Sequence, residues 1–445
     1  MLRSVLACCF FICFTGFAAA QVISGDLRVQ ARQALDAGDF QTALTQADRV
    51  LAINPTEPVS LMIRAVALRA LGRFEESLEA ATTAYNASDD DSLRFEAALI
   101  AGELNARLER FTRSQFWLRR ADQLAPPQLK PQVANAFRQV AAQNPLSFNL
   151  SFGIIPSDNV NNGSESTIIG LDTGFITLSD EDQALGGTEL SFGASVSYRL
   201  SQDETSRTDL LFDLAITEVF LDSEAETLAP DVEDSDFDFA ATVVGLRHRK
   251  LIWPELGATE GTLIAGRSWS GGDPQAFWRE ISLRQFVVRD ERNTLTFGAR
   301  FRNETRDDQP IAENNTFGLS FEWNRLLEGG NIFAFGASVN NTTSESAAID
   351  NLAIRVFARR TFDRVGIVQP SLLVSATTQN FSEFSIGVEG RRDDTLNLRL
   401  DLTFPDVSYF GFVPQATVEA RRVFSDLDAF ERQAVSVGLT AVSRF

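Results

Sequence analysis

The chain has 445 residues, 60 acidic against 40 basic side chains, and a formal net charge of −20. Such an acidic chain is a poor nucleic-acid binder, because that function needs clustered basic residues that release counterions from phosphates. All three cysteines precede Phe14 and the single histidine is His248, which excludes most thiol, metal and histidine-dependent enzyme chemistry.

Residues 1–20 have the pattern of a secretion signal. Arg3 supplies the positive charge, Val5 to Phe14 is an unbroken apolar run, and Ala18-Ala19-Ala20 places small residues before a cleavage point at Gln21. The run is too short to span a bilayer, which takes about 20 apolar residues. The mature chain is therefore expected to contain no disulfide, no metal and no cofactor.

Residues 21–143 are predicted to form an α-helical solenoid of the tetratricopeptide (TPR) type in the periplasm. Three triplets, Gly38-Asp39-Phe40, Gly72-Arg73-Phe74 and Glu109-Arg110-Phe111, recur at a period near 34 residues, and small residues follow each phenylalanine at matching positions. Pro131 to Gln143 predicts a further helix that caps the last repeat.

The first helix of each repeat is expected to line a groove that receives a client polypeptide. The pattern places the following residues there: Arg28, Arg32, Met62, Arg69, Leu99, Glu103 and Arg107. Ordinary solvated helix faces are the alternative, which the sequence leaves open.

After Asn144-Pro145 the apolar period changes from that of a helix to that of a strand. Phe148, Leu150, Phe152 and Ile154 alternate with small or polar residues, and the same alternation returns in 190–200, 317–323 and 396–404. A soluble β-sandwich would also alternate, but with shorter strands. Long alternating strands behind a secretion signal predict a transmembrane antiparallel β-barrel over residues 144–445.

The expected number of strands is fourteen. Fifteen segments qualify, but a barrel that begins and ends on the same side of the membrane needs an even number. We regard Gly366 to Thr377 as the doubtful segment, because Pro370 lacks the N–H that a strand ladder uses.

The alternation also predicts which side chains line the lumen. An arginine such as Arg399 turned toward lipid at mid-membrane would cost about 2–4 kcal/mol, whereas its apolar neighbours are stable there. Arg199, Glu322, Arg399 and Asp401 are therefore expected to face a polar lumen.

Two long connections, Pro156–Gly187 and Leu221–Asp236, are expected outside the cell, because periplasmic turns are short. The acidic residues between Asp222 and Asp238 predict a solvated loop, with cation bridges to lipopolysaccharide as the alternative. The terminal Phe445 is the expected signal for the barrel assembly machinery, although Ser443 departs from the usual pattern.

Two motifs that could carry chemistry are better explained structurally. His248 lies in Arg247-His248-Arg249-Lys250 near a strand end, where a basic anchor at lipid headgroups is more plausible than a general base. Asp158 to Gly163 is reminiscent of a calcium loop, but Val160 occupies a ligand position and no closing glutamate follows. A tight turn after the first strand is the better interpretation.

Several short motifs follow one another in a distinctive order behind the repeats. They are Pro145 to Gly153, Asn159-Val160-Asn161-Asn162, Arg391-Arg392-Asp393-Asp394, Tyr409 to Pro414, and Gly438-Leu439-Thr440 with the terminal Arg444-Phe445. This arrangement resembles the surface lipoprotein assembly modifiers, and the likeness covers nearly all of the mature chain. Asn159, Asn161, Gly411 and Pro414 are the motif residues that we single out.

The resemblance implies a periplasmic repeat domain joined to a fourteen-stranded outer-membrane barrel that helps a client, often a lipid-anchored protein, to reach the cell surface. Passage would use the lumen, or a seam between the first and last strands, Leu146–Ile155 and Ala434–Phe445. The expected partners are the client, outer-membrane lipids and lipopolysaccharide, and the assembly machinery, and the chain is expected to act as a monomer and not as an enzyme. A passive porin is the first alternative, and a polysaccharide exporter is the second.

Overall fold

The computed structural model of the protein describes residues 25–171, 174–385, 389–407, 409 and 411–443. The predicted secretion signal at residues 1–20 and the predicted assembly signal at Phe445 lie outside the described residues. The chain divides into two compact units between Asn144 and Pro145, against an expected boundary between residues 143 and 144. No helix in the described part combines the length and the apolar character needed to cross a bilayer.

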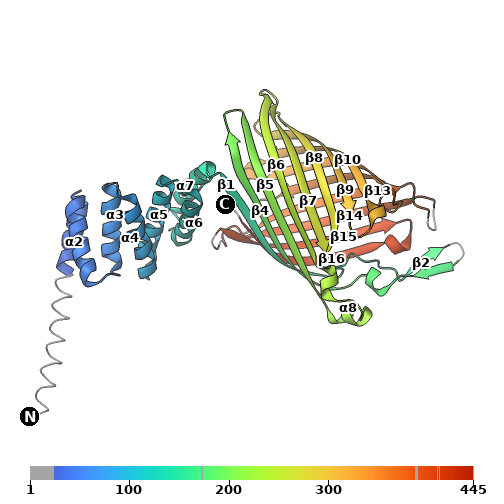
Figure 1. Ribbon diagram of the computed structural model, residues 1–445, viewed down its shortest axis with the longest axis horizontal. Coiled ribbons are helices and arrows are strands. Elements are labelled where there is room, and N and C mark those ends of the chain that lie inside the picture. The colour runs from blue at the N-terminus through green and yellow to red at the C-terminus, as the bar shows by residue number, and fades with distance from the viewer. Residues whose placement is uncertain (1–24, 172–173, 386–388, 408, 410, 444–445) are drawn as a thin grey trace, which may run out of the picture. The chain divides into compact units, whose positions relative to one another are not determined.

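The first unit is a stack of paired helices (Figure 1). Its elements are a helix over residues 25–36, α2 (Phe40–Ile53), α3 (Pro58–Ala70), α4 (Phe74–Ala87), α5 (Asp91–Arg107), α6 (Phe111–Leu124) and α7 (Lys130–Gln143). Phe40, Phe74 and Phe111 begin the second helix of each pair, so the repeat predicted from these phenylalanines is confirmed. α7 follows as the predicted additional helix and packs on α6 through Phe137 and Val140.

The small residues of the repeat allow the paired helices to approach closely. Ser77 is fully buried, and its hydroxyl donates to the carbonyl oxygen of Ala65 at 2.6 Å. Ser114 makes the equivalent bond to Gly102 at 2.7 Å. A Cβ atom on Gly102 would lie 2.9 Å from the side chain of Leu118, so this contact requires a glycine. The repeated hydroxyl-to-carbonyl bond therefore follows from the spacing seen in the sequence.

The turn inside each helix pair uses a left-handed backbone conformation. Gly38 and Gly72 have φ of 78° and 76°, and Glu109 occupies the same place in the third repeat with φ of 58°. A residue with a Cβ atom is strained in this region, whereas glycine is not. Glu109 is exposed, and its side chain makes no hydrogen bond or ion pair with the residues that the structure describes.

We expect Glu109→Gly to raise the free energy of unfolding of the helical unit by roughly 0.5–1 kcal/mol, because it removes the left-handed strain. Gly72→Ala at the equivalent turn is the matched control and is expected to lower it by about 1 kcal/mol. Thermal unfolding followed by circular dichroism measures both. A lower midpoint for Glu109→Gly would contradict this reading of the turn.

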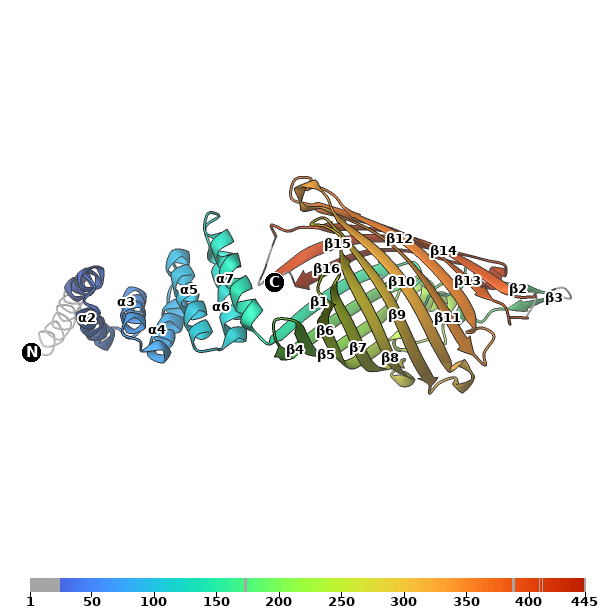
Figure 2. The same ribbon diagram turned by 90° about the horizontal axis from the view of Figure 1, so that it is seen from above.

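The second unit is a closed barrel of fourteen antiparallel strands, as predicted (Figure 2). The strands are β1 (Leu146–Ser157), β4 (Gly187–Gln202), β5 (Ser206–Leu221), β6 (Phe239–Trp253), β7 (Gly257–Ser270), β8 (Asp273–Val288), β9 (Asn293–Arg306), β10 (Asn314–Leu326), β11 (Ile332–Ser344), β12 (Asn351–Thr361), β13 (Gln369–Phe381), β14 (Arg391–Thr403), β15 (Phe412–Ser425) and β16 (Arg432–Ser443). Each pairs with its neighbours in the chain, and β1 closes the barrel against β16.

The doubt about the segment around Pro370 is wrong, because β13 is a regular barrel strand. Pro370 is its second residue and lies opposite Leu402 of β14. Its carbonyl oxygen accepts a hydrogen bond from the backbone N–H of Phe362 at 2.9 Å. A proline so close to a strand end removes little from the ladder, so it does not break the strand.

We call the end of the barrel where β1 begins the proximal end and the opposite end the distal end. Connections at the proximal end include short turns, and aspartates close two of them. Hydrogen bonds from the Ser206 hydroxyl and from the backbone N–H groups of Thr205 and Ser206 lower the pKa of Asp203. Hydrogen bonds lower the pKa of Asp290 as well, and the largest contribution comes from the backbone N–H of Arg292.

The longest loops lie together at the distal end, as the alternation of strand direction requires. Residues 158–186 join β1 to β4 and include a separate hairpin of β2 (Ile168–Leu171) and β3 (Gly174–Thr177) and a 3-10 turn, η1 (Asp180–Asp182). Residues 222–238 join β5 to β6 and include α8 (Ser223–Leu228) and η2 (Asp234–Phe237). Further 3-10 turns are η3 (Pro310–Ala312) and η5 (Asp428–Phe430) at the distal end and η4 (Glu328–Gly330) at the proximal end.

The outer wall of the barrel carries a belt of exposed apolar side chains. Leu263 and Ile281, which lie opposite each other in the register, each expose 54% of their surface, and Phe297, Leu319, and Leu398 are similarly exposed. Soluble monomers rarely expose contiguous apolar patches of this kind. The belt is suited to contact with lipid, and the alternate residues form the inner wall.

Candidate functional site

The inner wall is polar where the sequence predicts it to be. Arg199 lies opposite Asp209, and Arg399 lies opposite Glu419. The Nε atom of Arg399 donates to Oδ1 of Asp401 at 2.9 Å. All of these residues share the face opposite to the exposed leucines and phenylalanines. Glu322 is on the same face and accepts a hydrogen bond from Asn324 at 2.7 Å.

The most deeply buried carboxylate of this wall was not singled out from the sequence. Glu260 on β7 is 2% exposed and lies between Arg249 of β6, at 2.8 Å, and Arg284 of β8, at 2.9 Å. The side chains of the two arginines are about half exposed. The carboxylate of Glu260 therefore links β7 to both of its neighbours, β6 and β8. Only the strand register reveals this cluster, because the three residues are far apart in the sequence.

We expect Glu260→Gln to destabilise the barrel by about 2 kcal/mol, because two arginines lose a buried counter-ion that solvent only partly replaces. Glu322→Gln is the matched control, since Glu322 has no arginine partner among the described residues. Urea unfolding of the detergent-solubilised barrel measures both variants. Equal midpoints for the two variants would show that Glu260 contributes no more than an ordinary polar residue.

The residues predicted to line the repeat groove lie on the first helices of the repeats, and several of them are ion-paired. Arg69 of α3 donates to Glu103 of α5 at 2.7 Å, and Arg107 donates to the other oxygen of Glu103 at 3.0 Å. Arg28 pairs with Glu57 at 3.3 Å. The Arg28–Glu57 and Arg69–Glu103 contacts join successive repeats, whereas the Arg107–Glu103 contact lies within α5.

The other predicted groove residues are Met62, Leu99 and Arg32, and the first two are largely buried in the helical stack. Met62 is 7% exposed and packs in the core between α3, α4 and α5. Leu99 is partly buried against the α6 and α7 side of the stack. Arg32 pairs with Asp36 of its own helix at 3.2 Å. Of the predicted set, the charged residues are therefore the ones that keep exposed surface.

An aromatic and arginine cluster on the second helices was not anticipated. The guanidinium carbon of Arg120 lies 4.1 Å from the ring centroid of Phe116 and 4.9 Å from that of Trp117. Tyr85 of α4 packs edge-on against Trp117 at 5.2 Å. Trp117 also borders a groove of about 450 Å³ between α4 and α6, whose lining includes Glu79. The adjacent aromatic residues Phe116 and Trp117 are the signal of this cluster in the sequence.

The seam between β1 and β16 is interrupted. Ser151 to Ile154 pair with Leu439 to Val442, and pairing then resumes only at Ser157 opposite Ser436. By contrast, β1 pairs with β4 along its whole length from Leu146 to Ser157. Pro156 lies in the interruption and has no N–H to donate.

Side chains hold the distal end of this seam. The carboxylate of Asp158 accepts from the backbone N–H of Val435 at 2.7 Å. Asn159 is buried and donates to the carbonyl oxygens of Gln433, at 2.9 Å, and Gly163, at 3.0 Å. Asn161 accepts from the backbone N–H of Leu185 at 2.9 Å. The motif expected to form a tight turn therefore also connects the first strand to the last one.

The other two motif residues shape the proximal end of β15. Gly411 has φ of 82°, in a turn closed by two backbone hydrogen bonds between Tyr409 and Phe412. Pro414 lies opposite Ala441 of β16, and its carbonyl oxygen accepts from Phe404 at 3.0 Å. A glycine is favoured at the first of these positions because of its left-handed backbone.

The basic cluster around His248 is divided between the two walls. His248 shares the outer face with Leu246, near the proximal end, and its Nδ1 atom lies 2.9 Å from the Thr208 hydroxyl. Arg247 and Arg249 point to the inner wall and pair with Asp209 and Glu260. The proposed anchor for headgroups is thus reduced to His248 and Lys250, because strand alternation turns the arginines inward.

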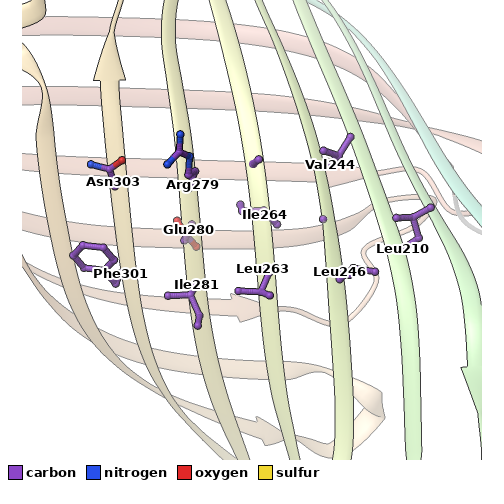
Figure 3. Close-up of a pocket in the computed structure, with 12 residues that line it drawn as sticks. Leu210, Val244, Leu246, Leu263, Ile264, Arg279, Glu280, Ile281, Phe301 and Asn303 are labelled. Carbon is purple, nitrogen blue, oxygen red and sulfur yellow. The ribbon is translucent and has the colours of Figure 1, made fainter.

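The outer wall carries a groove of about 700 Å³ across β6, β7, β8 and β9 (Figure 3). Leu263, Ile281 and Phe301 supply an apolar part, and Arg279 and Asn303 lie at the distal side of it. Ala265 lies in the same register row as Arg279. Because its side chain is small, it leaves a depression among larger neighbours.

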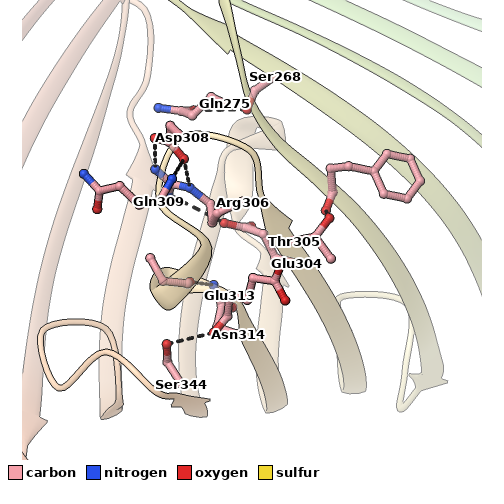
Figure 4. Close-up of polar contacts among 12 residues, drawn as sticks. Ser268, Gln275, Glu304, Thr305, Arg306, Asp308, Gln309, Glu313, Asn314 and Ser344 are labelled. Carbon is pink, nitrogen blue, oxygen red and sulfur yellow. Dashed lines mark hydrogen bonds and ion pairs between the residues drawn. The ribbon is translucent and has the colours of Figure 1, made fainter.

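Polar contacts hold the distal loops in place. Arg306 at the end of β9 donates to both carboxylate oxygens of Asp308, at 2.8 and 2.6 Å, and this hydrogen bonding lowers the pKa of Asp308 (Figure 4). The Ser344 hydroxyl donates to the carbonyl oxygen of Glu313 at 2.8 Å. The first contact orders the loop after β9, and the second joins this loop to the end of β11.

A second distal cluster surrounds Arg391 at the start of β14. Its guanidinium carbon lies 3.9 Å from the ring centroid of Phe381, 4.7 Å from that of Phe384 and 3.7 Å from that of Phe430. Asp393 pairs with it at 3.3 Å. One arginine thus connects the loops that follow β13 and β15.

No protein-family model and no curated protein sequence matches the chain. Solved structures resemble its two units separately. The TPR domain of Arabidopsis OM64 is 20% identical over 28% of this chain and 98% of its own, with a TM-score of 0.25. The Yersinia enterocolitica type III secretion translocator chaperone SycD is 11% identical over 27% of this chain and 83% of its own, with a TM-score of 0.25. A BenF-like porin from Pseudomonas fluorescens Pf-5 is 10% identical over 67% of this chain and 99% of its own, with a TM-score of 0.35.

Proposed function

We propose that this protein is a non-enzymatic outer-membrane factor that delivers client proteins, including lipid-anchored ones, to the cell surface. The observation that carries the proposal is the joining, in one chain, of a helical repeat unit to a barrel with an apolar outer wall and a polar inner wall. The belt favours insertion into a membrane. The repeat unit would lie in the periplasm and receive the client, since stacked helix pairs offer extended binding surfaces.

The charged first helices are the proposed docking surface. Two groups of ion pairs, Arg28 with Glu57 and Glu103 with both Arg69 and Arg107, present both signs of charge on the first helices of successive repeats. Charged side chains of a client segment could replace one partner in each of these half-exposed ion pairs. The replacement would cost little free energy, because exposed ion pairs contribute little stability. Docking would therefore be reversible, as delivery requires.

We place the route of the client at the seam between β1 and β16. The interruption at Ile155 and Pro156 leaves fewer backbone bonds to break there than between β1 and β4. An opened strand edge also offers its N–H and C=O groups to an incoming segment. Asp158 and Asn159 would act as the releasable distal closure of this seam.

A passive solute porin is the second candidate, and the polar, ion-paired inner wall favours it. Deletion of the gene distinguishes the two functions. For a delivery factor, we expect at least one surface protein to become inaccessible to protease on intact cells while small-solute uptake is unchanged. Loss of solute uptake with every surface protein still displayed would instead establish the porin.

A further inference from the structure

Arg279 is a charged residue on the apolar outer wall. It lies on β8 in the register row of Val244, Ala265 and Asn303, next to the apolar row of Leu263 and Ile281. An arginine on the lipid-facing side of a barrel strand is unfavourable, and increasingly so with depth. Its presence therefore calls for a compensating partner.

The protein does not supply that partner among the residues that the structure describes. Arg279 has no carboxylate partner there, and its guanidinium carbon lies 5.3 Å from the ring centroid of Phe277. Arg267, the nearest outward arginine on β7, is instead paired with Asp307 at 2.9 Å. The charge of Arg279 is thus available to an anion from outside the chain.

The surroundings of Arg279 indicate which anion would reach it. Phe277 and Trp269 lie on the distal side, and aromatic residues at such positions mark the level of lipid headgroups. On the other side lies the apolar part of the groove of about 700 Å³ (Figure 3). A cation and an apolar groove in this order match a phosphate group joined to an acyl chain.

We propose that the outer wall binds one phosphate-bearing lipid at this place. The guanidinium of Arg279 would bind the phosphate, a geometry that arginine favours. The side-chain amide of Asn303 donates to Asn315 at 3.0 Å and has a second N–H for the same phosphate. An acyl chain would lie in the groove along Leu263, Ile281 and Phe301. The inference depends on the apolar belt facing lipid, and it does not depend on client delivery.

Native mass spectrometry of the full-length protein in detergent tests the site. The probes are diphosphoryl lipid A, the same lipid after removal of its phosphates, and inorganic phosphate. We expect the intact lipid to bind preferentially and Arg279→Gln to weaken its binding roughly tenfold or more, since a charge-assisted hydrogen bond is lost. Arg325→Gln is the matched control, because Arg325 faces outward at the proximal end and has no carboxylate partner in the described part of the chain.

A second variant tests the groove without touching the charge. Ile281→Trp would fill the apolar part and is expected to weaken lipid binding while the guanidinium stays in place. Heat modifiability on gels verifies that each variant barrel is folded. Equal binding by the native protein and Arg279→Gln, or equal binding of the dephosphorylated lipid, would overturn the proposal. Full competition by inorganic phosphate would indicate a free-anion site and would overturn it as well. Failure of client display would leave all these results unaffected.

Discussion

A disulfide across the β1–β16 seam is expected to stop client display. Ser151 and Val442 lie directly opposite each other, so Ser151→Cys with Val442→Cys places two thiols on paired strands. The mature chain has no cysteine of its own if cleavage occurs before Gln21, so no other disulfide competes. In cells exposed to oxidant we expect display to fall to the level of a strain without the gene, and reductant to restore it. Protease accessibility of the client on intact cells measures this.

The control is an identical disulfide elsewhere in the barrel. Ser320 and Ser338 are paired between β10 and β11, on the inner wall, in a region where the register is uninterrupted. Ser320→Cys with Ser338→Cys should cross-link as completely and leave display unchanged. If the seam disulfide forms completely and display continues, the client does not pass through the seam. Loss of display in both double variants would point to a general effect of rigidifying the barrel.

Removal of residues 21–143 is expected to abolish display while the barrel still inserts. The two units are separately compact, and the strands of the barrel pair among themselves. The truncated protein should therefore remain heat-modifiable and fractionate with the outer membrane. The client should accumulate in the periplasm, because the proposed docking surface is gone. Undiminished display by this truncation would remove the docking role from the helical unit.

A finer variant separates docking from folding in the same assay. Arg69→Gln with Glu103→Gln removes the ion pair between α3 and α5 on the proposed docking surface. Arg73→Gln with Glu76→Gln removes an ion pair of comparable exposure at the start of α4 and is the matched control. We expect reduced display for the first double variant only. An equal reduction for both would indicate a loss of stability rather than of docking.

Local periodicity predicts the helix pairs and most of the barrel strands. The phenylalanines at 40, 74 and 111 located the second helices, since a repeat contains the same local signals each time. The alternation of Phe148 to Ile154 located the first strand and its outward face. The prediction was wrong around Pro370, where the missing donor lies near a strand end and does little harm.

Local periodicity predicts only part of the candidate site. Arg399 and Asp401 are two residues apart on one strand, so the sequence could place them on the same wall. Glu260 and its two arginines come from three strands, and their meeting depends on register. Met62 was assigned to a groove, whereas it packs in the core between α3, α4 and α5.

The division of the protein into a helical repeat and a barrel can be predicted from the sequence, because helical and strand periods are properties of neighbouring residues. The sequence also determines which face of each strand is apolar. The pairing of polar side chains between strands follows from the folded barrel alone. Glu260 meets Arg249 and Arg284, Asn159 bonds to β16, and Arg279 has no acidic partner among the described residues. Hydrogen-bonded register brings together residues far apart in the sequence, such as Asn159 and Gln433, which are 274 positions apart. A slip of one residue would move every side chain of a strand to the opposite wall.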